Sequence, residues 1–245
     1  MAILEGNGVT KYFGGLAAVS NVDFHVEQGE VVGLIGPNGA GKTTLFNLIS
    51  AALRLKSGTI KFRGIDITGF KPYRICRMGV ARTFQTVKIF PNMLVLQNVI
   101  LGSYFGMSPR ISSSDAPKKA SEILEFVGLS RVSATPARDL TLANQKRLEV
   151  ARALATHPDL LLLDEIMAGL NPTEVAEAME LVVRIREKGI SIIMIEHVMK
   201  AIMKLCDRIM VLHHGQKLAE GTPQEIATSE KVIKVYLGER AHAGS

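Results

Sequence analysis

One segment of the sequence has the residue types and spacing of a phosphate-binding loop. Residues 36–43 read Gly-Pro-Asn-Gly-Ala-Gly-Lys-Thr, which fits the pattern G-x-x-x-x-G-K-[ST] without exception. Glycines let the backbone turn tightly and bring its N–H groups against phosphate oxygens. Lys42 would place a positive charge on the outer phosphates, and Thr43 would offer a hydroxyl to Mg²⁺. The candidate nucleotide-binding residues here are Gly36, Pro37, Asn38, Gly39, Ala40, Gly41, Lys42, Thr43 and Thr44.

A second segment ends an apolar run with two acids. Four leucines at 160–163 precede Asp164 and Glu165. Ligands of open α/β sheets bind beyond the carboxyl ends of the strands, so these acids are placed to meet one. Asp164 could hold a metal ion, directly or through water, and Glu165 could polarise an attacking water. Acids at the solvated tip of a strand are the alternative, and the phosphate loop in the same chain favours the catalytic interpretation.

The elements that must position these residues predict an α/β fold. The alternation of apolar and polar residues at Val22, Phe24 and Val26 predicts a half-buried antiparallel strand near the N-terminus. Behind the strand at 31–35, Leu45, Leu48, Ile49 and Ala52 recur at helical spacing. Helical patterns also separate the later strands, as in a parallel sheet. One such helix has a cap at Asn171, Pro172 in its first turn and a capping-box acid at Glu174. Short runs that are apolar throughout predict buried parallel strands at 31–35, 160–163, 191–195 and 208–212.

The middle of the chain has a different pattern of apolar residues. Between about residues 90 and 141 no buried-strand pattern occurs, and the runs LVLQNVIL and EILEFVGL have the spacing of helices. We therefore expect a single domain over residues 1–245, with a core formed by 1–88 and 141–245. Residues 89–140 would form a helical subdomain inserted into that core.

Length and composition exclude several classes of protein. The chain has 245 residues, of which 47% are apolar and 21% charged, so it has enough apolar material for a core and is not disordered. No run approaches the roughly 18 apolar residues that cross a bilayer, and the N-terminus lacks the pattern of a secretory signal. We expect a soluble, cytoplasmic protein. Cys76 and Cys206 lie far apart without a CxxC pair and are expected to be packing thiols.

The charge is positive, with 29 Lys and Arg against 23 Asp and Glu, a net charge of +6 and a pI near 9.4. Such an excess occurs in nucleic-acid binders and in proteins that work beside anionic lipid. Here the basic residues are dispersed, with no run of five or six and no interleaved aromatics. A solvated basic surface is the expectation, and nucleic acid is not an expected partner.

Three further residues complete a pattern that resembles a known family. Gln85 ends a predicted strand (GVARTFQ), His197 follows the predicted strand ISIIMIE, and Phe13 lies before the phosphate loop. With the loop and the acids, their order resembles the ATP-binding subunits of ABC transporters over essentially the whole chain. The resemblance implies a P-loop (RecA-like) α/β core with an N-terminal antiparallel β subdomain and an inserted α-helical subdomain. It also implies an ATPase that uses ATP and Mg²⁺.

The resemblance assigns roles to these residues. It implies that Glu165, His197 and Gln85 are catalytic, with Gln85 reaching Mg²⁺ and the attacking water and His197 contacting the γ-phosphate. It implies that Phe13, or else Tyr12, stacks on adenine. The residues that it implies for Mg²⁺ are Thr43, Gln85 and Asp164.

Several strings narrow the resemblance to importers of branched-chain amino acids. They are FGGL at 13–16, ARTFQ at 81–85, AGLNPTE at 168–174 and the tail from 221 to 238. Urea and amide importers share most of them and stay an alternative. This type of transporter implies a second ABC ATPase subunit (a sister or a copy), two transmembrane permeases and an extracytoplasmic substrate-binding protein. The chain would then be peripheral, held by the permeases at the cytoplasmic face of the membrane.

Two residues depart from the family's pattern. The signature, usually LSGGQ, aligns with residues 140–144, so that Thr141, Ala143 and Asn144 would face ATP on the other subunit. Ala143 replaces a glycine, and it would strain the turn if that position needs a positive φ. We predict that Ala143→Gly raises turnover modestly, and equal rates for both proteins would mean that the alanine is harmless. Ile166 replaces the proline that normally follows the glutamate, which frees φ and adds a donor.

These departures predict a slower or asymmetric site. A regulatory nucleotide-binding subunit with a largely silent hydrolytic site is an alternative, and a soluble ABC protein of DNA repair or translation is another. The sequence has neither the long coiled-coil insertion nor the second cassette of those soluble proteins.

Overall fold

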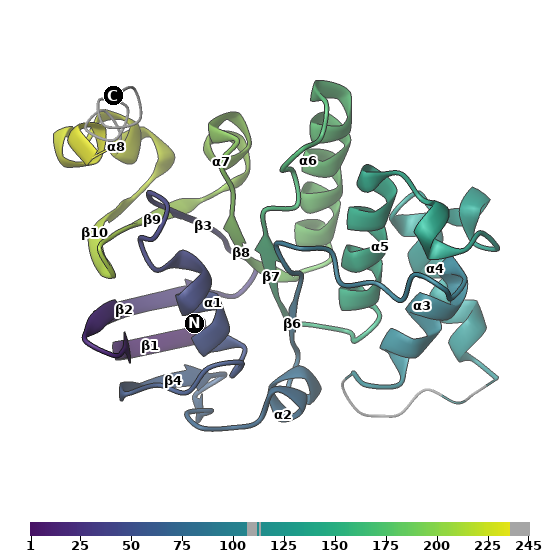
Figure 1. Ribbon diagram of the computed structural model, residues 1–245, viewed down its shortest axis with the longest axis horizontal. Helices are drawn as coiled ribbons and strands as arrows, with labels where there is room; N and C mark the ends of the chain where they lie inside the picture. Colours follow the sequence, from purple (N-terminus) through teal and green to yellow (C-terminus); the bar gives the residue numbers. More distant parts are fainter. Residues whose placement is uncertain (107–111, 113, 236–245) are drawn as a thin grey trace. The chain divides into compact units, whose positions relative to one another are not determined.

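The computed structural model describes residues 1–106, 112 and 114–235. Contacts between residues divide the chain into two compact units, which are described separately. The first unit comprises Met1–Lys71 and Ser191–Ser245, and the second comprises Pro72–Ile190 (Figure 1). Residues 236–238, in the tail that resembles the importers, lie outside the described residues. In the part of the chain that is described, no helix combines the length and the apolar character needed to cross a membrane.

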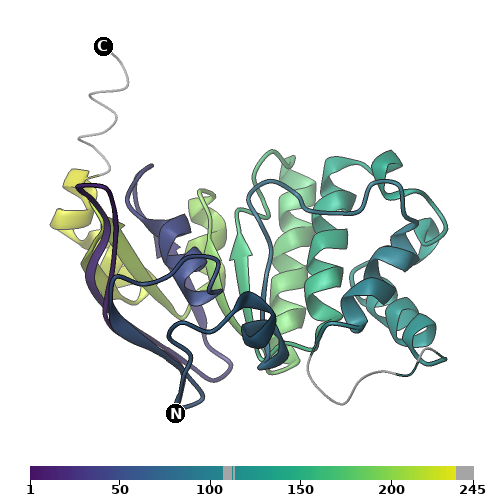
Figure 2. The same cartoon turned by 60° about the horizontal axis from the view of Figure 1, so that its bottom comes forward.

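Antiparallel strands form the N-terminal part of the first unit, as the alternating pattern predicts. Strand β1 (Ala2–Phe13) pairs with β2 (Leu16–Glu27) on one side and with β4 (Ser57–Phe62) on the other. The short β5 (Ile65–Asp66) pairs with β4. Figure 2 shows β1 and β2 as a long, curved hairpin in purple. The buried residues Val22, Phe24 and Val26 of β2 share one face, because side chains alternate along a strand.

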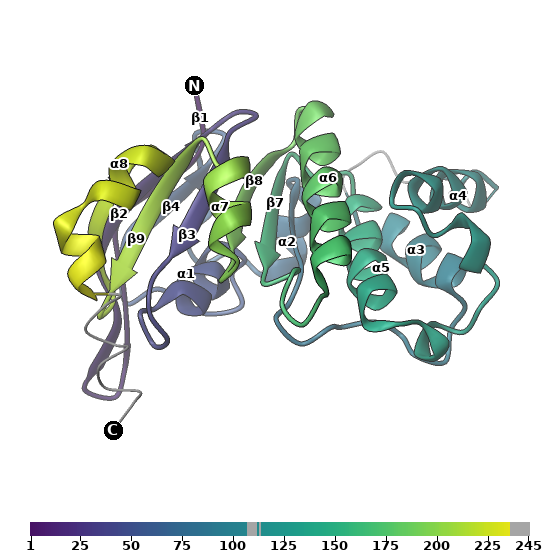
Figure 3. The ribbon, with the colours of Figure 1, turned by 90° about the horizontal axis from the view of Figure 1, so that it is seen from above.

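Parallel strands form the rest of the first unit's sheet structure. Strand β3 (Val31–Ile35) lies between β8 (Ser191–Ile195) and β9 (Arg208–His213) and is parallel to both. Strand β10 (Gln216–Gly221) pairs antiparallel with β9. Every residue of β3 and β8 is buried. Figure 3 shows β3, β8 and β9 side by side. The apolar runs at 31–35, 191–195 and 208–212 are thus confirmed as buried strands.

Helices α1 (Lys42–Ile49), α7 (Met199–Leu205) and α8 (Pro223–Thr228) of the first unit are short. The apolar spacing extends α1 to Ala52, but the helix ends at Ile49 because Ala51 takes a left-handed φ of 56°. Helix α8 begins with a capping box between Thr222 and Glu225.

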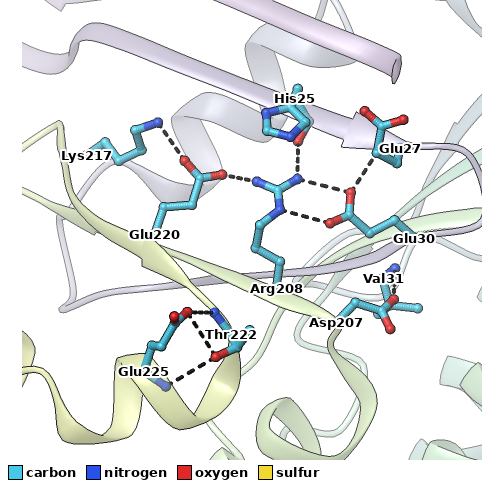
Figure 4. Close-up of polar contacts among 10 residues, drawn as sticks. All are labelled: His25, Glu27, Glu30, Val31, Asp207, Arg208, Lys217, Glu220, Thr222 and Glu225. Carbon is cyan, nitrogen blue, oxygen red and sulfur yellow. Dashed lines mark hydrogen bonds and ion pairs between the residues drawn. The ribbon is translucent and has the colours of Figure 1, made fainter. Parts of the chain in front are cut away.

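A charged cluster ties the strands of the first unit together (Figure 4). The guanidinium of Arg208, at the start of β9, donates to both carboxylate oxygens of Glu30 at 2.9 and 3.0 Å and to the carbonyl of His25 at 2.8 Å. It also pairs with Glu220 of β10, whose other oxygen accepts from Lys217. Because these carboxylates are largely buried, the pairs with Arg208 compensate their desolvation and fix the start of β9 to the end of β2 and to β10.

The second unit contains the acidic strand and most of the helices. Strand β6 (Val80–Arg82) is parallel to β7 (Leu160–Asp164), the acidic strand. The helices are α2 (Pro72–Arg77), α3 (Val95–Ser103), α4 (Ala116–Phe126), α5 (Leu142–Leu154) and α6 (Pro172–Glu187). Helix α3 packs against α4 and α5. Helix α6 begins as predicted, with a reciprocal capping box between Asn171 and Glu174.

The segment between 89 and 140 is mainly helical where it is described. It contains α3, α4 and two 3₁₀ turns at Ser130–Val132 and Ala137–Asp139. In this segment the described residues form one isolated bridge, Leu94 with Pro136, and no named strand. The boundaries of an inserted helical subdomain at 89 and 140 stay a prediction.

Candidate functional site

The predicted phosphate loop connects β3 to α1 in the first unit. Two of its glycines are required by close backbone approach. At Gly36, with φ 151°, a Cβ would lie 2.1 Å from the Leu212 carbonyl oxygen. At Gly41, with φ 103°, it would lie 2.3 Å from the Ala18 carbonyl oxygen. The loop is therefore held between β9 and β2, in a conformation that side chains at these positions would prevent.

Lys42 is folded into the loop. Its ammonium donates to the carbonyl oxygens of Gly36 and Pro37 at 2.7 and 2.8 Å, and only 7% of the residue is exposed. Helix α1 starts at Lys42, and no side chain caps its N-terminus. The first N–H groups of a helix have no acceptor within the helix, and the helix dipole favours an anion there. The buried ammonium of Lys42 and the uncapped N-terminus of α1 thus lie at the same loop. Both favour the binding of a polyphosphate there.

His197 and Phe13 belong to the same unit as the loop. Strands β3 and β8 are parallel with Leu34 opposite Ile195, so the loop after β3 and His197 after β8 leave one edge of the sheet. His197 is exposed there. Phe13, at the end of β1, is 49% exposed, and the Lys11 ammonium lies 5.4 Å from its ring centre. Tyr12 is 43% exposed, so both aromatic candidates have an accessible ring.

The acids and Gln85 come together in the second unit. Because β6 and β7 are parallel neighbours, the residues that follow them lie at one edge. The Gln85 amide donates to the Glu165 carboxylate at 3.2 Å, while Asp164 is buried at the end of β7. The sequence places Gln85 at the end of a strand, but β6 ends at Arg82, and Gln85 lies in the irregular segment that follows.

The signature residues begin α5. Thr141 is the N-cap, and its hydroxyl accepts from the Asn144 N–H at 3.4 Å. Ala143 lies within the helix and has no positive φ, so the condition under which it would strain the turn is not met. Ala143 and Ile166 are both buried and line the same small cavity. The two departures from the family's pattern are therefore neighbours in the structure.

Comparison with known proteins decides the family. The family model described as ABC transporter matches residues 19–168, and the model described as Branched-chain amino acid ATP-binding cassette transporter matches residues 216–242. The chain belongs to the ATP-binding cassette family. It is an ABC ATPase, whose ATP hydrolysis is coupled to transport.

Relatives of this ABC ATPase match it over nearly their whole length. The high-affinity branched-chain amino acid transport ATP-binding protein LivG of Salmonella typhimurium is 42% identical over 97% of this chain and 98% of the relative. The corresponding BraF of Pseudomonas aeruginosa is 40% identical with the same coverage. A probable LivG of Methanocaldococcus jannaschii is 34% identical over 98% of both chains.

Solved structures confirm the fold. A nucleotide-free ATP-binding cassette from an ABC transporter superposes with a TM-score of 0.87 at 32% identity, covering 96% of this chain and 99% of that one. The ADP conformation of an ATP-binding cassette gives the same TM-score and identity, covering 97% and 99%. The predicted α/β P-loop fold of the ABC ATPases is therefore correct for this cassette.

Arg82 contacts a predicted site residue, and the sequence did not reveal this pairing. Its guanidinium pairs with the Asp164 carboxylate at 3.0 Å, with side chains only 7% and 0% exposed. Thr83 accepts from the Asp164 N–H at 3.0 Å, which fixes the aspartate's backbone. The strand pairing places Arg82 opposite Leu162, two residues before Asp164. Its position in the ARTFQ string was the available signal, but a partner on another strand cannot be identified from that string alone.

The donor set of this cassette fits a magnesium–nucleotide complex. Among the described residues, no three His, Cys, Asp or Glu side chains gather into a metal-binding group. Mg²⁺ is usually held by one or two carboxylates together with phosphate oxygens and water. Of the predicted metal ligands, the carboxylate of Asp164 and the amide of Gln85 belong to the second unit, and the hydroxyl of Thr43 belongs to the first. Each is an oxygen donor of the type that Mg²⁺ accepts, and phosphate oxygens and water would supply the rest.

Proposed function

We propose that this chain is the ATP-hydrolysing subunit of an importer for branched-chain amino acids. The observation that carries the proposal is the identity of 40–42% with LivG and BraF over nearly the whole of both chains. The C-terminal match to the branched-chain amino acid cassette model supports it independently of the nucleotide-binding motifs, which all ABC ATPases share.

The first unit supplies the residues that bind ATP. The N–H groups of the loop from Gly36 to Thr44 bind phosphate oxygens, and Lys42 exchanges its bonds with the loop carbonyls for the outer phosphates. Phe13 stacks on adenine, and His197 contacts the γ-phosphate. The uncapped start of α1 and the buried ammonium of Lys42 are both in place before any anion arrives, which reduces the cost of organising the site.

The second unit supplies the hydrolytic residues. Glu165 acts on the attacking water as base or orienting group, and Gln85 holds its carboxylate through the 3.2 Å bond. Thr43, Gln85 and Asp164 would hold Mg²⁺, which when bound neutralises charge on the phosphates. Arg82 compensates the buried charge of the Asp164 carboxylate at the end of this strand.

Hydrolysis is shared between subunits. The signature residues Thr141, Ala143 and Asn144 at the start of α5, of which Thr141 is exposed and Ala143 is buried, face the nucleotide of a second ABC ATPase subunit, with the helix N-terminus directed at its γ-phosphate. Two permease subunits hold the pair at the cytoplasmic face of the membrane, and an extracytoplasmic binding protein delivers the substrate. Each nucleotide is therefore incompletely bound until the dimer closes.

The test is recovery of the complex from native membranes through a tag on this chain. We expect two permeases, a second ATPase and a binding protein to copurify, and we expect that binding protein to take leucine, isoleucine or valine in a titration. A binding protein that takes urea or an amide instead would contradict the substrate, and the absence of any permease would contradict the transporter.

A further inference from the structure

Helix α5 carries three charged side chains on one face that point into the second unit. Lys146, Glu149 and Arg152 are three residues apart, the spacing that places helix side chains in one row. Lys146 is only 7% exposed and Glu149 only 5%, and Arg152 is half-buried. Charged side chains are seldom so buried unless they are paired. We call these residues the α5 charged row.

Lys146 holds the segment that contains Glu165. Its ammonium donates to the carbonyl oxygen of Glu165 at 2.8 Å and to that of Ala168 at 2.6 Å. Glu165 has a φ of 52°, in the left-handed region that a residue with a side chain seldom occupies. Such a conformation persists only where the surroundings hold it. The bond from Lys146 to the carbonyl of Glu165 itself is a direct way of holding it.

Glu149 and Arg152 hold the segment that contains Gln85. One carboxylate oxygen of Glu149 accepts from the Lys88 N–H at 3.0 Å and from the Phe84 N–H at 3.3 Å, on either side of Gln85. Arg152 donates to the Lys88 carbonyl. Burial raises the pKa of the Glu149 carboxyl above its ordinary value, although those two N–H groups oppose the rise. The irregular backbone from 84 to 88 is thus attached to α5 at both ends.

The geometry points to Lys146 and Glu149 as positioning residues for hydrolysis, which fix the backbones around Glu165 and Gln85 to the helix that begins at the signature. Both hydrolytic residues are attached to one rigid element, and Gln85 and Glu165 also bond each other. A displacement of α5 at its Thr141 end would therefore move the two together. This inference rests on the proposed ATPase function and adds residues that do not themselves touch the nucleotide.

The first test compares neighbouring lysine and arginine variants in ATP hydrolysis by the assembled complex. Lys146→Met removes the ammonium and keeps most of the stem. Arg147→Met is the matched control, because Arg147 pairs with the half-exposed Glu177 on α6. We expect Lys146→Met to lower kcat about 10- to 100-fold, since small displacements of catalytic groups have such effects. The KM for ATP should change less than about 2-fold, because a lost positioning contact acts on the chemical step. Lys146→Arg should recover most of kcat.

The second test follows the backbone itself and needs no turnover. Amide hydrogen exchange of the isolated chain should rise over residues 164–170 in Lys146→Met and over 83–90 in Glu149→Leu. Glu149→Gln, which keeps the accepting oxygen, should leave 83–90 close to wild type. If Lys146→Met does not fold, Lys146→Gln takes its place in both tests, since it keeps an N–H donor without the charge.

Two results would overturn the inference. One is a Lys146 variant with the same kcat as Arg147→Met, and the other is exchange that rises across the whole unit rather than in the named segments. Failure of the proposed function would be seen differently. A wild-type complex without ATPase activity would contradict the function, while the exchange measurement would still decide whether the α5 charged row holds these segments.

Discussion

The buried ion pair between Arg82 and Asp164 gives a sharp test of what stabilises the end of β7. Replacing Arg82 by Met keeps a long apolar stem but leaves the Asp164 carboxylate, which is 0% exposed, without the guanidinium at 3.0 Å. Removing one partner of a buried pair costs about 3–5 kcal/mol, since the remaining charge loses its counter-ion. Arg82 also lies over the Phe84 ring at 5.0 Å, a contact worth about 0.5–1 kcal/mol at an exposed site.

The assay is urea unfolding of the isolated chain, with the single variant Asp164→Asn and the double variant Arg82→Met, Asp164→Asn as the matched comparisons. A loss of about 4 kcal/mol, with a urea m-value of about 2–3 kcal/mol/M, lowers the midpoint by about 1–2 M. Because Asn carries no charge, the double variant should recover most of the loss. Arg82→Met with an unchanged midpoint, or a double variant whose loss is the sum of the two single losses, would refute the reasoning.

Two further predictions concern a signature residue and a thiol. Ala143→Gly should lower the unfolding free energy by about 1 kcal/mol because glycine is a poor helix former, which urea unfolding checks. Turnover in a steady-state ATPase assay should equal that of wild type, since Ala143 has no positive φ to relieve, and a clear gain in turnover would contradict the structure. Burial, with a contribution from the Asp207 carboxylate, raises the pKa of the Cys206 thiol to about 12, so that at pH 8 only roughly one molecule in ten thousand carries its thiolate. A maleimide should therefore label Cys206 only after unfolding, and rapid labelling of Cys206 in the folded chain would count against this burial.

The strands and the best-delimited helix could be predicted from local patterns. Strands β3, β7 and β8 are buried along their whole length, and that condition itself produces an uninterrupted apolar run. Helix α6 starts at its predicted position because Asn171, Pro172 and Glu174 act within a few residues of one another. The start of α6 is determined by interactions between residues close in sequence. The buried strands are recognisable because burial affects every residue of the strand alike.

The parts that were missed depend on residues distant in sequence. Helix α1 ends before Ala52 because the backbone turns at Ala51, although the apolar spacing continues. Arg82 and Lys146 are charged and would be expected at the surface. They are buried because the fold brings Asp164 to one and the carbonyls of the 165–168 turn to the other. The types of residue in the site were readable from the sequence, but the groups that hold them were not.

The roles of the site residues could be assigned only in part from contiguous motifs. The phosphate loop and the acids at 164 and 165 are contiguous motifs whose chemistry follows from residue type. The link between Gln85 and Glu165, 3.2 Å apart, joins residues 80 positions apart along the chain. The backbone strain expected at Ala143 was inferred from the glycine that the family has at this position. It does not occur, because α5 begins at Leu142 and includes Ala143.

The central claim is that this chain hydrolyses ATP with Glu165 acting on the attacking water. The most direct measurement is single-turnover hydrolysis of radiolabelled ATP by the purified complex, comparing wild type with Glu165→Gln after nucleotide binding has been measured for both. Loss of a general base lowers the rate about 10²- to 10⁴-fold, so we predict that the variant binds ATP with wild-type affinity and cleaves it at least about 100-fold more slowly. Equal rates in the two complexes would contradict the account.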